Sequence, residues 1–397
     1  MKILVVCQYY YPEPFRITDI CEELVKRGHQ ITVLTGLPNY PEGRILKEYR
    51  KKEHRDEIRN GVRIIRCNEH GRGKNAINML WNYFSFAFSG KRKVRKLDKD
   101  FDVVFINQLS PIMMAWPGIK YAKEFFKKSV LYCYDLWPAS LSAGGIKKGS
   151  IIYQYFRNIS KRIYNNVDHI CVTSKSFSNY LVEEHGTNKD KISYLPQYCE
   201  ELFDSIDTQP HKGINFVFAG NIGQMQSVQT IIRAATLIKG HKGIKIHIVG
   251  DGRDLVNCKN LAIELKADNV IFYGRRPLEE MPKFYAMADA MLVTLAKDEL
   301  VSKTLPGKVQ SYMAAGKPII AAIDGEGAEI IQEADCGFVC EAENYHKLAE
   351  LLISFLCVDK NRLSTNSLDF YKNRFSKDVF YHRLDEVLNE VLKGTKL

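Results

Sequence analysis

The 397-residue sequence lacks any apolar stretch near the roughly 18 residues that a membrane-spanning helix needs. Its first residues, MKILVVCQYYYPEP, contain a single Lys and no small-residue cleavage site after the short apolar run, so we expect no secretory signal peptide. Ten cysteines form no CxxC pair, and several lie inside apolar runs such as HICVTS. This distribution favours reduced core cysteines in a cytosolic protein over a disulfide framework or a structural zinc site.

Motifs of several enzyme classes are also missing. The sequence has no HExxH, no carboxylate cluster with metal-ligand spacing and no GxSxG elbow, which argues against a metallohydrolase or a serine hydrolase. The first predicted strand is followed by QYYYPEPFR and not by GxGxxG. This difference argues against a nicotinamide or flavin enzyme that uses this part of the chain.

Hydrophobic residues make up 45% and charged residues 26% of the sequence, values that are typical of globular proteins, and the length predicts two domains. The net charge of +11 is uneven. Residues 1–200 contain 33 Lys and Arg against 20 Asp and Glu, and the rest contains 24 against 26. The first half therefore either faces an anionic partner, nucleic acid or a phospholipid surface, or is basic for solubility alone.

Two series of alternating strands and helices follow one another. The first has strands at 2–7, 31–34, 62–66, 102–106, 130–134, 169–173 and 192–195 and helices at 17–26, 75–96, 113–126, 151–164 and 177–184. The second has strands at 214–219, 244–249, 270–273, 290–295 and 319–322 and helices at 227–238, 255–265, 281–286, 309–315, 328–333, 346–355 and 379–392. Such alternation predicts parallel sheets that are covered by helices on both faces.

The polar stretch 198–213 shows no periodicity and separates the two series. We expect an α/β protein of two Rossmann-like domains that face each other across a cleft, residues 1–200 and 201–397, with a C-terminal helix at 376–393 that packs back on the first. Ligands of open parallel sheets bind beyond the carboxyl ends of the strands, so the loops there are the candidates for function.

In the first domain, polar residues follow three strands. Asp135 comes directly after the fifth strand and could accept a proton, hold a sugar hydroxyl or simply cap the turn before Trp137. The amides of Asn107 and Gln108, at the end of the fourth strand, suit sugar hydroxyls. Arg16 stands at the start of the first helix, where it could meet an acceptor or only solvent.

In the second domain, three strands end in glycine-rich turns. Gly220, Asn221 and Gly223 precede a helix that begins near Gln226, an arrangement that exposes backbone N–H groups to a phosphate. Further along the chain, the candidates at the next two strand ends are Gly250, Asp251, Gly252, Arg275 and Arg276. Two adjacent arginines make a diphosphate partner plausible.

The segment SKTLPGKVQSYMAAGKP at 302–318 contains Lys303, Thr304, Lys308 and Ser311. Lys308 falls in the first turn of a predicted helix, where the helix dipole disfavours a cation unless an anion lies between them. Solvated lysines are the alternative.

The helix at 75–96 combines an apolar face with a basic end. Its face is formed by Ile77, Leu80, Trp81, Phe84 and Phe88, broadened by Met79 and Phe86, and its end carries Lys91, Arg92, Lys93, Arg95 and Lys96. This pattern is typical of a helix on an anionic membrane, although an ordinary core helix with a solvated end fits it too.

Over nearly its whole length the chain resembles retaining GT-B glycosyltransferases of sugar-transferase family four. The resemblance depends on MKILVVCQYYYPEP, ELVKRGHQITVLTGLPNYPEG and DLWPASL in the first domain, and on FVFAGNIG, IHIVGDG, KTLPGKVQSYMAAGKPIIA and GEGAEIIQEADCGFVC in the second. The subgroup most similar to it adds N-acetylated deoxy sugars such as N-acetyl-L-fucosamine during bacterial surface-polysaccharide assembly.

This resemblance implies a nucleotide-sugar donor, UDP-linked, in the C-terminal domain and a lipid-linked saccharide acceptor in the N-terminal domain, without a metal cofactor. It also implies a cytoplasmic enzyme at the inner face of the plasma membrane and no nucleic-acid partner. Arg16, Asn107, Gln108 and Tyr134 are the expected acceptor contacts, and Asp135, Lys308 and Arg275 the expected catalytic residues. Retention in this fold is usually described as front-side attack, in which the leaving diphosphate helps to deprotonate the acceptor.

The chain departs from the family pattern at several positions. Asn221 and Gln226 stand where an Arg and a Lys commonly hold the diphosphate, Ser311 and the region of Lys303 replace two glutamates, and Tyr134 replaces a His. The cationic role would then pass to Arg275, Arg276, Lys303 and Lys308. Two alternatives to a transferase are a UDP-N-acetylglucosamine 2-epimerase-like enzyme of the same fold and a catalytically silent partner that only binds nucleotide sugar.

Overall fold

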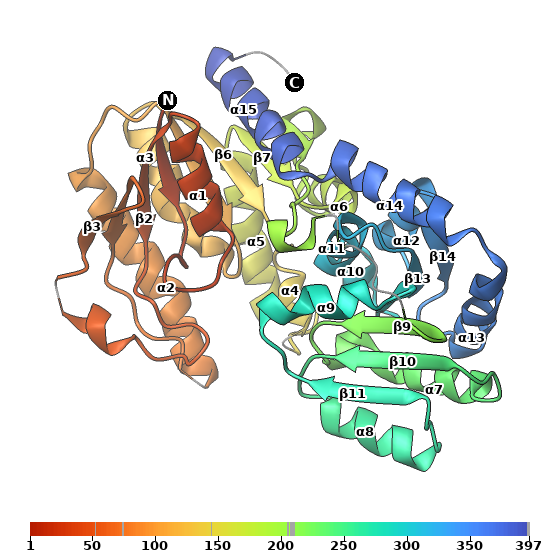
Figure 1. The fold of residues 1–397 in the computed structure, drawn as a ribbon. Helices are drawn as coiled ribbons and strands as arrows, with labels where there is room; N and C mark the ends of the chain where they lie inside the picture. The colour runs from red at the N-terminus through yellow and green to blue at the C-terminus, as the bar shows by residue number, and fades with distance from the viewer. Residues whose placement is uncertain (52, 74, 144, 205, 207–210, 395–397) are drawn as a thin grey trace. The chain divides into compact units, whose positions relative to one another are not determined.

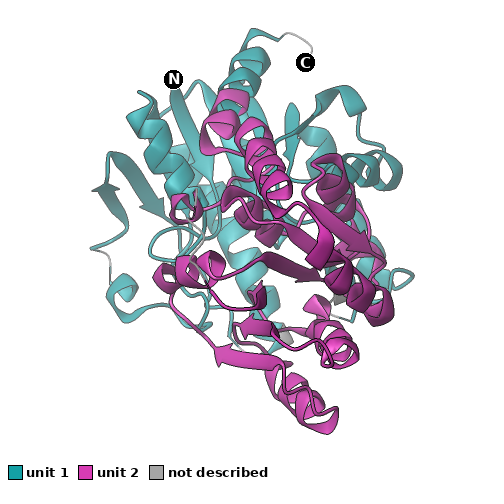
Figure 2. Ribbon diagram, turned by 45° about the vertical axis from the view of Figure 1, so that its right-hand side comes forward, with its two compact units in different colours: residues 1–195, 384–397 teal, residues 196–383 magenta. Residues whose placement is uncertain are grey.

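The computed structural model describes residues 1–51, 53–73, 75–143, 145–204, 206 and 211–394 (Figure 1). The chain forms two compact units, residues 1–195 with 384–397 (unit 1) and residues 196–383 (unit 2), coloured separately in Figure 2. The division therefore falls at 195 instead of the expected 200. The chain returns to unit 1 from Leu384 and not from 376, part of the way along the last helix, α15 (Lys377–Lys393).

Unit 1 contains an eight-stranded sheet in the order β3-β4-β2-β1-β5-β6-β7-β8. Every neighbouring pair is parallel except β3 and β4. The strands are β1 (Lys2–Val6), β2 (Gln30–Thr35), β3 (Asp56–Arg59), β4 (Val62–Arg66), β5 (Val103–Gln108), β6 (Lys128–Cys133), β7 (His169–Val172) and β8 (Ile192–Tyr194). β1 is central and apolar because both of its faces are covered, as is usual for parallel sheets.

The helices of unit 1 are α1 (Ile17–Lys26), α2 (Ala76–Lys93), α3 (Trp116–Glu124), α4 (Ser140–Ala143), α5 (Ile151–Asn166) and α6 (Lys175–His185). Short 3-10 turns extend two of them: η2 (Val94–Lys96) follows α2, and η3 (Ile112–Ala115) precedes α3. From Leu384 onward α15 adds Leu384 and Leu388 to the buried core, and its Asp385 lies 3.4 Å from His29.

Unit 2 contains a six-stranded parallel sheet in the order β11-β10-β9-β12-β13-β14. Its strands are β9 (Ile214–Ala219), β10 (Ile244–Val249), β11 (Val270–Gly274), β12 (Ala290–Thr294), β13 (Ile319–Ala322) and β14 (Gly337–Cys340). Its helices are α7 (Val228–Ile238), α8 (Leu255–Glu264), α9 (Met281–Ala286), α10 (Glu299–Ser302), α11 (Gly307–Ala314), α12 (Glu326–Glu333), α13 (Tyr345–Ser354) and α14 (Lys360–Arg374). Figure 1 shows β9, β10 and β11 side by side. The apolar core of this unit gathers around β9, β10 and α7.

Besides the four-residue helices α4 and α10, the elements β3, β14 and α14 were not expected from the sequence, because none presents a long apolar pattern. β3 reads DEIR and is an exposed antiparallel edge strand. β14 has only four residues. α14 is largely polar, and its buried residues Leu363, Ser367 and Tyr371 form a single row at four-residue spacing.

α2 differs in one respect from the expected apolar face. Phe86 was expected to broaden this face but is fully buried, so it belongs to the core. Ile77 and Trp81, in contrast, are 70% and 64% exposed.

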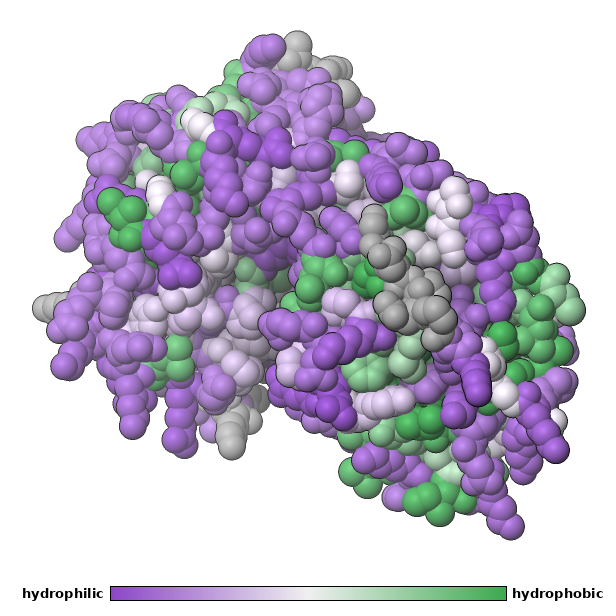
Figure 3. Space-filling model, in the orientation of Figure 1, coloured by the Kyte–Doolittle hydropathy of each residue, from purple (hydrophilic) through white to green (hydrophobic). Residues whose placement is uncertain are grey.

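Within the described ranges no helix is both long and apolar enough to span a bilayer. Figure 3 shows hydrophilic side chains over most of one face of the molecule, with smaller hydrophobic patches such as the one over α8, where Val256 and Ile263 are exposed. All ten cysteines are free thiols, and every one except Cys357 is buried.

Candidate functional site

A cavity of about 900 Å³ opens at the carboxyl ends of β9, β10 and β11 in unit 2. Seven of the residues expected to bind a nucleotide sugar line it, namely Gly220, Asn221, Gly250, Asp251, Gly252, Arg275 and Arg276. They come from three turns that are distant in the sequence. The parallel sheet brings these turns together because neighbouring strands end at the same edge.

The floor of this cavity is built from glycine backbone. The N–H of Gly220 donates to Val249 O and that of Gly250 to Gly274 O, both at 2.9 Å, so the strand pairing continues into the turns. Gly250 has a φ of +143°, and a Cβ there would lie 1.8 Å from Gly220 O. Only glycine fits this position, and the bare backbone lets a ligand approach the strand ends closely.

Lys308 projects from α11 toward the same glycine turn. Tyr312, one helical turn later, accepts from Ala219 N at 3.1 Å and donates to Ala219 O at 3.0 Å, which fixes α11 against the end of β9. Lys308 Nζ consequently lies next to Gly220, 3.5 Å from the position that a Cβ of that residue would take. It also lies 4.0 Å from the centroid of the Phe218 ring.

The Lys308 ammonium is buried and has no hydrogen-bond or ion-pair partner among the residues that the structure describes. Burial lowers the pKa of Lys308 to about 7 from its usual value near 10.5. A buried cation without a counter-charge is costly, and an anion bound at the Gly220 turn would remove that cost. The arrangement can therefore hold a phosphate and gain a proton on Lys308 as it does so.

The remaining predicted cations of unit 2 differ in whether an acidic side chain already compensates their charge. Arg275 and Arg276 are exposed at the cavity, and Arg276 Nη1 lies 3.9 Å from Glu280 Oε2. Lys303 instead lies 2.8 Å from Glu299 one turn earlier on α10, so its charge is already compensated.

Six predicted residues of unit 2 are absent from the cavity lining: Lys303 and Lys308, described above, and Gly223, Gln226, Thr304 and Ser311, which act within the fold. Gln226 Oε1 accepts from Asn221 Nδ2 and from Gly223 N, and so shapes the turn. Thr304 donates to Val301 O. Ser311 donates to Lys308 O and lies 3.2 Å from the Tyr285 hydroxyl, behind the wall.

The apolar side of the cavity was missed by sequence reasoning. Phe203 and Tyr285 stack at 4.8 Å between ring centroids, and both line the cavity with Pro277, Leu278 and Met281. Phe203 lies in the segment that the sequence presents as an unstructured boundary, and no local pattern connects it to Tyr285. The cavity thus offers cations at one side and a flat apolar surface at the other.

In unit 1, Asp135 lies just beyond β6. Its Oδ2 accepts from Ser110 Oγ at 2.9 Å, and the same hydroxyl accepts from Trp137 Nε1 at 2.8 Å. Burial raises the pKa of Asp135, and the Ser110 hydrogen bonds partly offset this effect. A carboxylate held in this way is suited to accept a hydrogen bond or a proton.

The other predicted acceptor contacts of unit 1 have unequal roles. Burial raises the pKa of Tyr134, and the charge of Arg16 opposes this shift. Asn107 is buried at the end of β5, and its Oδ1 has no partner among the described residues. Gln108 is fully buried, and its Nε2 donates to the carbonyls of Leu109 and Asp135. Gln108 therefore holds the Asp135 turn in place, and an acceptor contact of its own does not fit its position.

A second buried carboxyl of unit 1 was also missed. Glu69 Oε1 accepts from Gln8 Nε2 at 2.7 Å and Asn82 Nδ2 at 2.6 Å, and its Oε2 accepts from Leu37 N at 3.0 Å. Burial raises the pKa of Glu69 to about 8. This cluster connects the loops after β1, β2 and β4 with α2. Its only signal in the sequence is that Glu69 stands two residues after Cys67, which directly follows β4.

Comparisons with known proteins agree with this geometry. Residues 16–197 match the family Glycosyltransferase Family 4, and residues 201–367 match Glycosyl transferases group 1. A probable glycosyltransferase, WbjE of Pseudomonas aeruginosa, is 27% identical over 79% of this chain and 80% of its own length. WcaI of Escherichia coli K12, a putative colanic acid biosynthesis glycosyl transferase, is 25% identical over 80% and 82%.

Solved structures show the same fold. HepE of Anabaena, crystallised in complex with UDP, superposes with a TM-score of 0.73 over 98% of this chain and 100% of its own, at 14% identity. The chain is therefore a glycosyltransferase of the GT-B fold, as the two matched family domains, the named relatives and the two Rossmann-like units with their parallel sheets agree.

Proposed function

We propose that this glycosyltransferase moves a sugar, an N-acetylated deoxyhexosamine, from a UDP-sugar to a lipid-linked saccharide in bacterial surface-polysaccharide assembly, with retention of the anomeric configuration. The observation that carries the donor assignment is the buried Lys308 ammonium beside the Gly220 turn. The ammonium lies behind the Gly220 turn that lines the cavity of unit 2, and a phosphate bound at this turn would supply the counter-charge that Lys308 lacks.

The shape of the cavity supports a nucleotide diphosphate as the donor. Lys308 and Arg275 would meet the diphosphate, while the stacked Phe203 and Tyr285 offer an apolar wall to a base. We choose uracil as the base because the structural neighbour HepE is described in complex with UDP. The colanic acid description of WcaI supports a polysaccharide product.

In the proposed reaction the bond between the anomeric carbon and the β-phosphate oxygen breaks. An acceptor hydroxyl attacks from the same face of the sugar, and its proton passes to the leaving phosphate. Negative charge grows on that phosphate, so Lys308 and Arg275 stabilise the transition state more than the ground state. Asp135 of unit 1 would orient the acceptor hydroxyl, beside Arg16, Asn107 and Tyr134.

We also infer that these side chains replace a divalent cation at the diphosphate. Each charge-assisted hydrogen bond to a phosphate oxygen contributes roughly 1.5–3 kcal/mol. Activity should then survive dialysis against EDTA, and full recovery only with Mg²⁺ or Mn²⁺ would contradict this part of the proposal.

The donor is tested by a thermal-shift screen of UDP-, GDP- and dTDP-sugars, because a ligand that binds only the folded state raises its stability. We expect a shift with UDP-sugars that is absent for GDP-sugars. Release of free UDP on addition of a lipid-linked acceptor then identifies a transferase. An epimerase would change the sugar without that release, and a silent binding partner would show the shift without turnover.

The lipid-linked acceptor implies that unit 1 approaches a membrane, and α2 is the surface that we assign to this contact. Its Leu80 and Phe88 are about half exposed, and Ile151 at the start of the neighbouring α5 is 89% exposed. Phe84 and Phe156 stack between the two helices. The apolar surface thus lies beside the basic end of α2, as in interfacial helices on anionic lipid.

Vesicle co-sedimentation tests this contact. The protein should bind vesicles that contain anionic lipid at low salt and be released at high salt, because screening weakens each charge contact. Replacing Ile77 and Trp81 by Ser should lower the bound fraction. If the protein remains in the supernatant with both anionic and neutral vesicles, the exposed face of α2 has another purpose.

A further inference from the structure

A second cavity of unit 1 differs from all the sites above because its wall is basic. It has a volume of about 440 Å³ and lies between the end of β4 and the last turns of α2. Its lining consists of Arg55, Arg66, Cys67, Asn68, Ser89, Arg92, Lys93 and Lys96. The wall contains five cationic residues and no Asp or Glu. Because burial raises the pKa of the Cys67 thiol to about 12, that group is neutral as well.

Of the five cations of this wall, only Arg66 has an acidic partner, Glu57, among the described residues. Arg92, Lys93 and Lys96 form no ion pair within the described part of the chain, and Arg55 donates only to the carbonyl of Cys67. Their neighbour Arg95, in contrast, is not part of the lining, and its Nε lies 3.4 Å from Glu124 Oε1. The last turn of a helix attracts cations through its dipole, but this effect does not gather them around a hollow.

Arg66 at the back of the wall provides an independent observation. Its side chain is completely buried, with Nη1 on Glu57 and the carbonyl of His54 and Nη2 on the carbonyl of Tyr11. Its Nε is buried and has no hydrogen-bond partner among the described residues. A fixed donor of this kind, at a wall of unpaired cations, is suited to an anionic oxygen.

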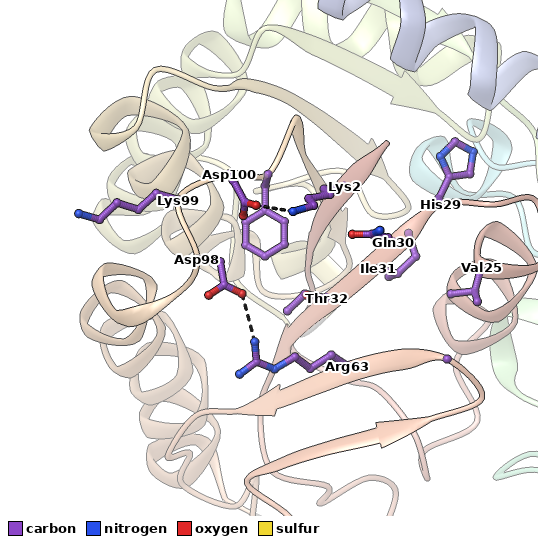
Figure 4. Close-up of a pocket in the computed structure, with 12 residues that line it drawn as sticks. Lys2, Val25, His29, Gln30, Ile31, Thr32, Arg63, Asp98, Lys99 and Asp100 are labelled. Atoms are coloured by element: carbon purple, nitrogen blue, oxygen red, sulfur yellow. Dashed lines mark hydrogen bonds and ion pairs between the residues drawn. The ribbon is translucent and has the colours of Figure 1, made fainter.

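Another cavity of the same unit serves as a comparison. It lies at the amino ends of β1 and β2, and there the cations are paired: Lys2 with Asp100, and Arg63 with Asp98 at 3.1 Å (Figure 4). Charge in that cavity is satisfied by the protein itself. The lining of the basic cavity has the same kind of cations without an acid among them, and only Arg66 is paired, with Glu57.

We propose that the basic cavity binds a phosphate or diphosphate group, separately from the donor site of unit 2. The apolar face of α2 is continuous along the helix with Arg92 and Lys93, so the phosphate of a lipid is the source that this position favours. The proposal depends on the fold of unit 1 and not on the proposed sugar transfer, because it concerns binding alone.

The test is a calorimetric titration with inorganic diphosphate in the presence of excess UDP, which occupies the donor site. The Arg92→Gln, Lys93→Gln, Lys96→Gln triple variant should lose at least tenfold in diphosphate affinity, since three cations of the wall are removed. Arg95→Gln is the matched control, with one charge removed from the same segment but not from the wall, and it should bind like the wild type. UDP affinity should be unchanged in both variants.

A second arm identifies the source of the phosphate. Vesicles of phosphatidylcholine with phosphatidic acid, which present a phosphomonoester, are compared with phosphatidylserine vesicles adjusted to the same surface charge. Binding that prefers phosphatidic acid and is lost in the triple variant points to a lipid phosphate, and binding of free diphosphate alone points to a soluble one. Diphosphate affinity that is equal in the triple variant and the wild type, or absent from both, overturns the proposal whether or not UDP binds.

Discussion

The candidate sites of the two units occupy the same place in their sheets, beyond the carboxyl ends of parallel strands, but they are built from opposite kinds of side chain. In unit 2 the cavity has a glycine floor, and next to its Gly220 lies a buried cation, Lys308, that has no hydrogen-bond partner among the described residues. In unit 1 the side chains are acids and amides, such as Asp135 and Glu69, whose carboxylates already accept hydrogen bonds. Positive charge in unit 2 suits a diphosphate. Oriented hydrogen-bond acceptors in unit 1 suit a saccharide hydroxyl.

This comparison predicts its largest effect at Asp135. Asp135→Asn should lower kcat about 100-fold while leaving UDP affinity nearly intact, because the neutral amide loses the charge-assisted hydrogen bond of about 1.5–3 kcal/mol that would orient the acceptor hydroxyl. Steady-state kinetics combined with UDP titration separates the two quantities. If the variant is as active as the wild type, Asp135 only caps the turn, where Ser110 holds it.

Lys308→Ala should produce the complementary result in unit 2. Loss of the ammonium removes a charge-assisted contact of about 1.5–3 kcal/mol, so UDP affinity should fall more than tenfold. Lys303→Ala is the matched control, since Glu299 already compensates its charge, and should change UDP affinity little. Unchanged calorimetric affinity in both Lys308→Ala and the Arg275, Arg276 double variant would refute the donor assignment.

Gly36→Ala tests whether the unit 1 cluster is independent of the donor cavity. A Cβ at Gly36 would lie 1.7 Å from Glu69 Oε2 and 2.8 Å from Gln8 O, so the cluster must move. We expect a loss of about 1–3 kcal/mol in unfolding free energy, as for other overpacked sites. Thermal unfolding measures that loss, and a weaker UDP affinity in the same variant would show that the two sites are not independent.

The pH dependence of UDP binding should give the smallest effect. The pKa of Lys308 is lowered to about 7 in the free protein and is expected to rise when a diphosphate is bound. Binding above pH 7 then requires uptake of a proton, so UDP affinity should be nearly constant below about pH 6, fall about twofold from there to pH 7 and fall about fivefold from pH 7 to pH 8. Calorimetry in buffers of different ionisation enthalpy counts that proton, and Lys308→Ala should abolish the uptake.

The sequence alone predicted two α/β units and most of their strands and helices. Buried parallel strands are continuous apolar runs, and their helices carry apolar residues at a regular spacing, so the bounds of α1, β4, β9, β10, α9 and β13 agree with those expected from the pattern. The glycines and arginines at the strand ends could be predicted as one site, because a parallel sheet brings neighbouring strand ends to the same edge. Edge elements such as β3 escaped this reasoning, since an exposed strand needs no apolar run.

Only the tertiary structure decided which polar residues are free to act. Lys303 and Lys308 look alike in the sequence, yet one is paired with Glu299 and the other is buried beside Gly220 because Tyr312 anchors its helix to β9. The pairing of Phe203 with Tyr285 joins segments about 80 residues apart. Ion pairs and burial of this kind depend on long-range packing, which no local pattern records.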